Sequence, residues 1–319
     1  MAWDGIIRIK LSRPLTDDEK SRQLKVGIAA SATPNDNFSV FEKNDVFLET
    51  SNAQYHERGM LTYGGIFAVP LCLFGIATIM DMMLNVPDAI RKNGEMAVGL
   101  IGLGVIGLCV ALLLGAVLWG LHTEWFTWTR LPVRFNRRTR MVHAFRGAGA
   151  KGVISVPWDK AFFFVEARGK EVISRTNAYN IRCHVLDERQ YVVRSFSIGK
   201  SVASFRDDST TQGAEIVGIL SAEFEYIRRY MENGPYDVPS PEYIPTEVSL
   251  SNSMKIWMRS DKRLLRSGNP LAMLVLAFSP FAALTGLLHY IGQLTCREPA
   301  WPEDIQRECA LTGSEAVKV

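Results

Sequence analysis

The sequence predicts an α+β membrane protein with three transmembrane helices and one cytosolic, β-rich domain that ends in a helix. Three long stretches contain no Asp, Glu, Lys or Arg, which predicts the membrane spans. Alternating apolar residues, followed by apolar residues three or four apart, predict the strands and the helix of the domain. With 36 Lys and Arg against 33 Asp and Glu, the averages fit a soluble protein. The clustering of apolar residues nevertheless excludes a cytosolic globule, a secreted disulfide scaffold and a disordered chain.

Residues 1–60 are expected to form a cytosolic segment with a short strand, a helix and a loop. Ile6 to Leu11 alternate partly as a strand does, and Thr16 and Glu19 have the spacing of a capping box, which starts a helix. Residues 31–52 have a loop-like composition. The segment has too little apolar surface to fold alone, so we expect it to dock on the rest of the cytosolic part.

Residues 61–121 are expected to form a transmembrane hairpin of two spans, 61–80 and 96–121. Each span is long enough to cross about 30 Å of hydrocarbon at about 1.5 Å per residue. Neither lies at the N-terminus, where a signal peptide would place its apolar stretch.

The second span contains a stripe of small residues at a spacing of four, namely Gly107, Ala111 and Gly115. Small residues allow another helix to approach closely. The partner would be another span of the same chain or a span of a second copy in a homo-oligomer, and the sequence leaves both open.

Residues 122–234 are expected to form the β-rich domain. A predicted hairpin over 133–145 precedes strand-like runs at 153–156, 161–166, 179–186 and 191–198. The period then changes to three or four, which predicts one amphipathic helix that buries Ile216, Leu220, Phe224, Ile227 and Met231. Several antiparallel strands closed by a C-terminal helix resemble the element order of a pleckstrin-homology fold.

A stiff, Pro-rich and then basic linker is expected over 235–270. It leads to a third transmembrane helix at 271–294 and to a tail at 295–319. His289 lies within that span, where it is a candidate for a proton relay or, more simply, for a hydrogen bond to a neighbouring helix.

Positive charges close to the membrane set the predicted orientation. The section 122–270 has 23 Lys and Arg against 16 Asp and Glu, concentrated at its two membrane-proximal ends. Because Lys and Arg stay on the cytoplasmic side, this section and the N-terminus are expected in the cytoplasm. The hairpin turn and the C-terminal tail are then expected in the periplasm. Tyr290 and Trp301 fit an aromatic belt at the outer end of the third span.

Cys296 and Cys309 both lie in the predicted periplasmic tail. An oxidising periplasm would favour a disulfide between them. The alternative is two unpaired thiols in a mobile tail.

Arg137, Arg138 and Arg140 crowd a predicted turn beside the membrane. They are candidates for holding anionic lipid headgroups, at roughly 1 kcal/mol each near the surface. The alternative is that these arginines reflect only the general excess of positive residues on the cytoplasmic side of a membrane. Nucleic-acid binding is not expected, because the positive charge of this section gathers at its membrane-proximal ends.

No catalytic, cofactor-binding or metal-binding residue is predicted, and no cofactor. Gly147 to Gly152 has the letters of a dinucleotide-binding motif, but the next residues continue as extended chain instead of opening a helix. Gly199-Lys200-Ser201 matches only the end of a phosphate-binding loop, because Arg194 stands where the first glycine belongs. The five histidines have no metal-ligand spacing.

The run Leu131 to Val142 and the motif Val156-Pro157-Trp158-Asp159 resemble an uncharacterised family of bacterial inner-membrane proteins. Members of that family are encoded beside type VI secretion effectors, and they share the early hairpin and the late third span. The resemblance covers about residues 60–290. It implies a setting in competition between bacteria, and it carries over no catalytic residue.

The expected function is therefore that of a non-enzymatic immunity protein, which neutralises a cognate secreted toxin by binding it. The tail or the cytosolic domain would make the contact, depending on where the toxin acts. The alternative is a membrane-anchored lipid-sensing or scaffolding protein that uses its pleckstrin-homology-like domain.

Overall fold

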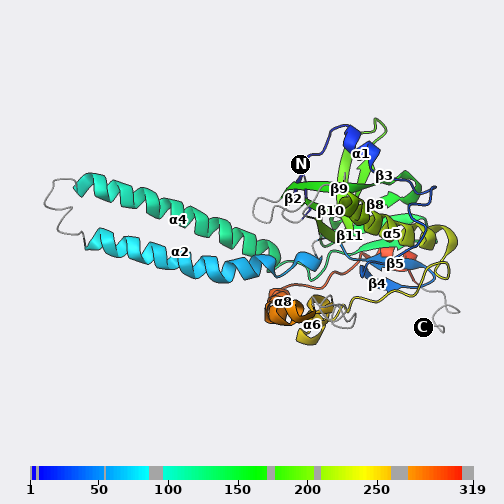
Figure 1. Cartoon of the computed structure of the whole chain (residues 1–319). Coiled ribbons are helices and arrows are strands. Elements are labelled where there is room, and N and C mark those ends of the chain that lie inside the picture. Colours follow the sequence, from blue (N-terminus) through cyan, green and yellow to red (C-terminus); the bar gives the residue numbers. More distant parts are fainter. Residues whose placement is uncertain are drawn as a thin grey trace. The chain divides into compact units, whose positions relative to one another are not determined.

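The structure is a computed structural model that describes residues 2–4, 7–53, 55–85, 96–170, 177–204, 210–259 and 272–310. It has the predicted α+β class, and the chain folds into two compact units (Figure 1). Unit 1 consists of Met1–Glu57, Trp128–Glu247 and Arg297–Val319, and unit 2 consists of Arg58–Thr127 and Val248–Cys296.

A five-stranded antiparallel sheet of unit 1 joins the N-terminal segment to the predicted β-rich domain. Its strands, in the order in which they pair, are β4 (Val40–Lys43), β5 (Phe47–Thr50), β6 (Val133–Asn136), β7 (Met141–Phe145) and β8 (Val153–Pro157). Leu48 of β5 lies opposite Phe135 of β6. The prediction of a loop over residues 31–52 is therefore wrong for β4 and β5, because pairing with a strand distant in sequence decides their structure.

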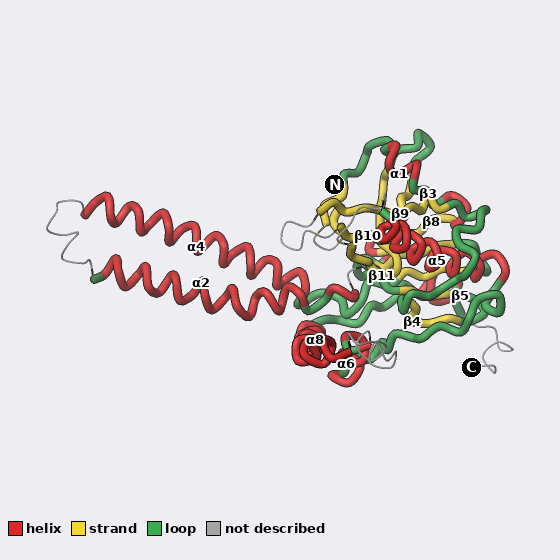
Figure 2. Tube along the Cα trace, viewed as in Figure 1, coloured by secondary structure: helices red, strands yellow, loops and turns green. Residues whose placement is uncertain are grey.

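A four-stranded antiparallel sheet forms the second layer, and Figure 2 shows its strands beside α5. Its strands pair in the order β11 (Val192–Ser204), β10 (Asn177–Leu186), β9 (Phe162–Lys170) and β3 (Gln23–Leu24). β3 belongs to the N-terminal segment, which confirms that this segment docks on the domain. A separate ribbon pairs β1 (Ala2–Asp4) with β2 (Ile7–Ile9), and short 3₁₀ turns occur at Tyr55–Glu57, Ala150–Gly152 and Trp158–Lys160.

Helix α5 (Thr211–Asn233) closes the core of unit 1, as predicted. Thr210 caps its first turn by accepting a hydrogen bond from the amide of Gly213 at 3.2 Å, and Gly234 follows its last residue at a φ of 104°. The ring of Phe224 stacks on the indole of Trp158, with centroids 6.0 Å apart. The five positions that the periodicity assigned to the core are all buried: Ile216, Leu220, Phe224, Ile227 and Met231.

The first part of the predicted linker belongs to unit 1. Ile244 is buried, and its amide donates to the carbonyl of Val40 at 2.8 Å. The hydroxyl of Tyr226 donates to the carbonyl of Pro239 at 2.8 Å. These contacts hold residues 235–247 against the domain, so this stretch is an ordered part of unit 1.

The C-terminal tail also belongs to unit 1. Trp301, Ile305 and Cys309 are buried on and beside the short helix α9 (Glu303–Glu308). They pack against Val46, Phe47 and Phe145 in a second hydrophobic cluster. A backbone hydrogen bond adds to this packing, since the amide of Thr129 donates to the carbonyl of Arg297 at 2.8 Å.

The buried ion pair between Arg134 and Glu49 joins the tail to the N-terminal and middle segments of unit 1. Arg134 on β6 donates to the carboxylate of Glu49 on β5 at 2.6 Å. The indole of Trp301 donates to the same Glu49 oxygen at 3.0 Å, and the Arg134 guanidinium lies 4.8 Å from the centre of the Trp301 ring. One carboxylate thus receives bonds from the middle section and from the tail.

The predicted placement of the tail across the membrane from the middle section is therefore wrong. A packed core and a shared, buried ion pair cannot be divided by a bilayer, because the separated charges and apolar side chains would be exposed. The charge-counting rule failed here because it treats the tail as a free loop, whereas Trp301 and Ile305 make it part of a folded body.

Unit 2 is helical. It contains α2 (Met60–Leu84), α4 (Met96–Glu124), α6 (Leu250–Trp257) and α8 (Ala272–Leu294). Among the described residues, Leu61–Leu84 and Met96–Glu124 are long and apolar enough to cross a membrane. They run side by side as a hairpin (Figure 1), with Gly75 of α2 against Val110 of α4. The predicted hairpin is thus present as two adjacent apolar helices, and the predicted third span is a helix, α8.

Truncating Trp301 tests whether the tail is part of the folded body. We expect Trp301→Ala to lower the free energy of unfolding by about 3 kcal/mol, because it removes a buried indole and leaves Glu49 with one donor fewer. The exposed Glu298 offers a matched control, and Glu298→Ala is expected to change stability by less than about 0.5 kcal/mol. Urea unfolding of the full chain in detergent measures both, and equal midpoints for the two variants would contradict the packing.

Candidate functional site

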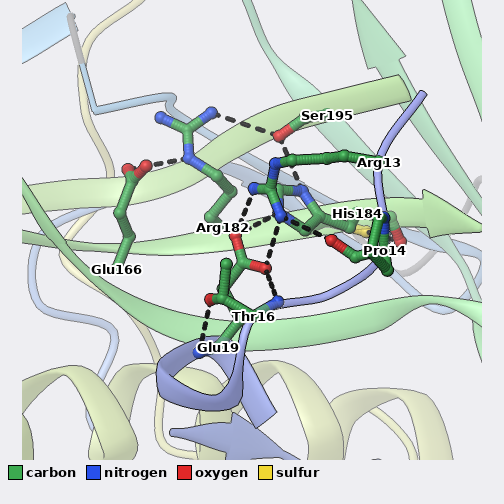
Figure 3. A network of polar contacts seen from close by, with 9 residues as sticks. Arg13, Pro14, Thr16, Glu19, Glu166, Arg182, His184 and Ser195 are labelled. Atoms are coloured by element: carbon green, nitrogen blue, oxygen red, sulfur yellow. Dashed lines mark hydrogen bonds and ion pairs between the residues drawn. The ribbon is translucent and has the colours of Figure 1, made fainter. Parts of the chain in front are cut away.

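A network of polar contacts lies in unit 1, where the N-terminal segment meets the four-stranded sheet (Figure 3). His184 on β10 is its centre. Its Nε2 lies 3.1 Å from Oε1 of Glu19, and its Nδ1 lies 2.9 Å from Oγ of Ser195 on β11. Arg13 donates to both oxygens of Glu19, at 2.5 Å and 2.9 Å.

Local structure positions each of these groups. The capping box predicted from Thr16 and Glu19 is present: the Glu19 carboxylate accepts from the Thr16 amide at 2.8 Å, and the Thr16 hydroxyl accepts from the Glu19 amide at 3.2 Å. It starts helix α1 (Asp17–Ser21) and holds the carboxylate over the sheet. His184 and Ser195 are cross-strand neighbours, so the register of β10 and β11 sets their contact.

A second buried charge continues the network along β10. Arg182 shares a sheet face with His184, and its side chain is 1% exposed. Its Nε lies 2.7 Å from a Glu166 oxygen, and its Nη1 donates to Oγ of Ser195 at 3.4 Å. A guanidinium at this depth needs such a partner, because an unpaired buried charge is strongly destabilising.

The network fixes the protonation states of its members near neutral pH. Burial raises the pKa of Glu19, but the hydrogen bonds from Arg13, Thr16 and His184 outweigh it and hold that pKa at about 2. Burial lowers the pKa of His184, against the opposing effect of Glu19. Glu19 is therefore an anion at neutral pH, and His184 is a neutral imidazole.

The order carboxylate, imidazole, hydroxyl is that of a hydrolase triad, but the surroundings favour a structural role. Ser195 and His184 are both buried, so a substrate has no open path to the hydroxyl. Both oxygens of Glu19 are also bound by Arg13. The arrangement cross-links the N-terminal segment to two strands, which is what a closed polar network does well.

Sequence reasoning found the capping box but missed the rest of this network. The available signal was the alternation of polar residues on one face of β10, formed by Asn180, Arg182 and His184, with the apolar Ile181, Cys183 and Val185 between and after them. Their partners Glu19 and Ser195 are brought together only by the fold.

A second buried carboxylate, Glu223 on α5, was also missed. Burial raises its pKa to about 7, although hydrogen bonds from Asn37 at 2.9 Å and from the Lys200 amide at 3.3 Å oppose this. Gly199 lets the carboxylate approach, since a Cβ there would lie 1.8 Å from a Glu223 oxygen. Gly199 and Lys200 lie within β11, in agreement with the rejection of a phosphate-binding loop.

Unit 2 contains its own buried carboxylate, Glu124, at the C-terminal end of α4. It accepts hydrogen bonds from the amide of Gly59, from the amide of Thr62 at 2.7 Å and from the Thr62 hydroxyl at 2.6 Å. The indole of Trp125 donates to the same hydroxyl at 2.7 Å. Glu124 thus serves as the N-terminal cap of α2, which has no capping side chain of its own.

The three candidate lipid-binding arginines have separate partners in unit 1. Arg140 bonds Asp159 at 2.6 Å and Glu232 at 3.0 Å, and Arg138 donates to the carbonyl of Ala310 at 3.3 Å. The guanidinium of Arg137 lies near Gly234. The structure therefore does not gather them into one free cationic site, and it gives Arg140 two neutralising carboxylates.

The stripe of small residues on α4 is divided between two environments. A Cβ on Gly107 would lie 3.4 Å from Ile79 of α2, so this residue faces the other helix of the hairpin. Ala111 and Gly115 are exposed, and a Cβ on Gly115 would meet nothing within 4 Å. Close helix approach within the hairpin thus uses Gly107 and not the other two.

The two candidate disulfide cysteines are free thiols in the structure. Cys309 is buried in unit 1, where the Asn136 amide group contacts its sulfur at 3.4 Å. Cys296 belongs to unit 2, and its thiol donates to the carbonyl of Gly292 at 3.1 Å. The predicted bond is not formed.

The interpretations of the Gly147 to Gly152 run as a turn and of His289 as a hydrogen-bonding residue agree with the structure. Gly147 to Gly152 forms the turn between β7 and β8, so it opens no helix. His289 bonds a neighbouring helix, with its Nδ1 3.0 Å from Oγ of Ser253 on α6. No group of three His, Cys, Asp or Glu side chains in the described part of the chain could hold a metal ion.

The fold and site define an α+β protein with a hairpin of two helices that are apolar and long enough to cross a membrane, and with a large unit held together by buried polar networks. Residues 110–313 match the model of a family described as a family of unknown function, DUF6708, and the chain belongs to that family. The match includes the Leu131 to Val142 run and the Pro157-Trp158-Asp159 motif. No curated protein and no solved structure matches the chain.

Neutralising Glu19 tests the network that joins the N-terminal segment to the sheet. We expect Glu19→Gln to lower the free energy of unfolding by about 2 to 4 kcal/mol at pH 7, because it leaves the half-buried Arg13 without its charge partner. The folded-state pKa of Glu19 lies below its ordinary value, so its contribution is present above about pH 4.5 and is lost as the pH falls toward 2.

The difference between Glu19→Gln and wild type should therefore shrink between pH 7 and pH 3, which denaturant unfolding at several pH values measures. Asp17→Asn in the same helix is the matched control, because the Asp17 side chain is fully exposed. A loss that stays constant over this range would show that the charge of Glu19 is not what stabilises the contact.

Proposed function

We propose that the chain is a non-enzymatic, membrane-anchored binding protein whose binding part is unit 1. In the setting that the family resemblance implies, it is an immunity protein of a type VI secretion locus in the bacterial inner membrane. It neutralises a cognate secreted toxin by binding it.

The assembly of unit 1 from three separated segments carries the proposal. The chain leaves unit 1 after Glu57, passes through the two apolar helices and re-enters it at Trp128. Two crossings return it to the side from which it started, so the whole of unit 1 faces one compartment. The excess of Lys and Arg in its middle section supports the cytoplasm as that compartment.

A single compartment changes which surface is proposed to meet the toxin. The tail offers little apolar surface for contact with a toxin, since Trp301, Ile305 and Cys309 are buried. The proposed contact is instead the loop after α5, on which Tyr236 is 84% exposed. Exposed tyrosines on a pre-ordered backbone are favourable binding residues, because they bury much area at little cost in entropy.

The rest of this loop is held in place, which supports Tyr236 as a rigid anchor. Lys43 donates to the carbonyl of Pro235 at 3.1 Å, on one side of Tyr236. Val238 is buried on the other side, and the Tyr226 hydroxyl bonds the carbonyl of Pro239. The ring thus projects from a backbone that needs no further ordering on binding.

Lipid sensing stays the alternative, together with the pleckstrin-homology interpretation of the strand and helix order. The partners of Arg138 and Arg140 weigh against it, because a headgroup would have to compete with Ala310, Asp159 and Glu232 for these guanidinium groups. A homo-oligomer through the exposed Ala111 and Gly115 is likewise a proposal.

Competition between sister cells tests the binding function. We expect deletion of the gene to make cells sensitive to neighbours with an active secretion system, and wild-type protein to restore survival. Tyr236→Ala should restore survival poorly at equal protein abundance, whereas Ile28→Ala, another exposed apolar side chain of unit 1, should restore it fully. Full survival of the deletion strain would refute the immunity role, and full activity of Tyr236→Ala would refute the proposed contact.

A further inference from the structure

The loop before β4, residues 35–39, has an unusual backbone conformation in unit 1. Asn37 and Phe38 both have a positive φ, at 49° and 54°. This is the left-handed region, which a bulky residue such as Phe rarely adopts. Phe38 is nevertheless buried, and so is Ser39, which follows it. Such a conformation persists only where the surrounding structure holds it in place.

The two ends of the 35–39 loop are fixed by backbone hydrogen bonds. The amide of Asn35 donates to the carbonyl of Ala222 on α5 at 3.0 Å. At the other end, the amide of Ser51 donates to the carbonyl of Ser39 at 2.7 Å. Both bonds would break if the loop moved away from the rest of unit 1, so the amides of Asn35 and Ser51 report on its opening.

The middle of the loop is bonded to a buried carboxylate, that of Glu223. Asn37 donates to one of its oxygens at 2.9 Å, and the amide of Lys200 on β11 donates to the other at 3.3 Å. Gly199, at a φ of 67°, leaves the space that the carboxylate fills. Glu223 is thus enclosed by α5, β11 and the 35–39 loop, and the loop is the part of this enclosure that belongs to no helix or sheet.

The enclosure penalises the charged form of Glu223. Burial raises the pKa of Glu223 to about 7, and the negative charge of Asp36 acts in the same direction. If the loop opened, water would reach the carboxylate and its pKa would return toward the ordinary value. The closed conformation therefore binds the proton more tightly than the open one. Its advantage is complete below the ordinary pKa and is lost as the pH rises toward 7.

Other charged or titratable groups also lie on the elements around the loop. Among the described residues they include Asp36, Lys200, His56, Glu57 and Tyr226. Lys200 contacts Glu223 through its backbone amide, and the half-buried ring of His56 lies beside Phe38, with centroids 6.1 Å apart. Burial raises the pKa of Tyr226, so its hydroxyl stays neutral at these pH values. Glu223 differs from all of them because it is an acid that the loop itself encloses.

We propose that the 35–39 loop is a pH-responsive latch with Glu223 as its sensor. The neutral carboxyl group keeps the loop shut, and the ionised carboxylate favours its opening. Opening exposes the apolar ring of Phe38 and lets water reach Glu223. The latch is a regulatory device of unit 1, and the inference does not depend on the proposed binding function.

Hydrogen–deuterium exchange of the full chain in detergent, followed by mass spectrometry, tests this inference. Exchange at Asn35 and Ser51 is compared between wild type and Glu223→Gln at the same pH, so the intrinsic pH dependence of exchange cancels. Gln has the shape of the neutral carboxyl group. We expect the ratio of the wild-type rate to the Glu223→Gln rate to rise about tenfold per pH unit between about pH 5 and 7, and to level off above that.

Glu215→Gln is the matched control, because Glu215 is an exposed carboxylate on the same helix. The ratio of the wild-type rate to the Glu215→Gln rate should not change with pH. A ratio to Glu223→Gln that stays constant with pH would overturn the latch. A rise of the same size in the ratio to Glu215→Gln would overturn it as well.

Asp36→Asn keeps the inference testable should Glu223→Gln fail to fold. This variant keeps an acceptor for the Phe38 amide, which the Asp36 carboxylate bonds at 3.2 Å. It removes a negative charge that raises the pKa of Glu223, so loop opening should level off at a lower pH. The ratio of the Asp36→Asn rate to the wild-type rate should therefore fall between pH 5 and 8, and a constant ratio would refute the role of Glu223.

Discussion

The topology of this protein depends on one buried carboxylate, that of Glu49. It receives a hydrogen bond from Arg134 and another from Trp301, and so joins the N-terminal, middle and C-terminal segments of the chain. Loss of either partner would leave charge or hydrogen-bonding capacity unsatisfied in the interior. Because the three segments share this contact and the hydrophobic cluster around it, they fold as one body and lie in one compartment.

Because of that constraint, each helical region must leave unit 1 and return to it on the same side of any membrane that it enters. The α2 and α4 hairpin meets it with two apolar helices, and Glu124 closes the base of the hairpin by capping α2 from the end of α4. The sequence between α6 and α8 contains Arg259, Asp261, Lys262, Arg263 and Arg266, which makes a second apolar span there unfavourable.

Local patterns in the sequence were enough to predict the apolar helices, the capping box at Thr16 and Glu19, and the buried stripe of α5. Each is set by neighbours within a few residues. The strands β4 and β5, the His184 network and the place of the tail were not predictable in this way, because each depends on contacts between distant segments. Trp301 shows the difference: taken alone, an aromatic residue after an apolar span indicates a membrane interface, yet its indole is bonded to Glu49 inside a folded unit.

The compartment of the C-terminus is the most direct test of this account. Fusions of a green fluorescent protein and of alkaline phosphatase to Val319 measure it in living bacteria, because the first fluoresces when folded in the cytoplasm and the second is active in the periplasm. We predict that the fluorescent fusion is bright and the phosphatase fusion inactive, with the same result for fusions at the N-terminus. An active phosphatase at Val319 together with a cytoplasmic N-terminus would contradict the single-compartment assembly of unit 1.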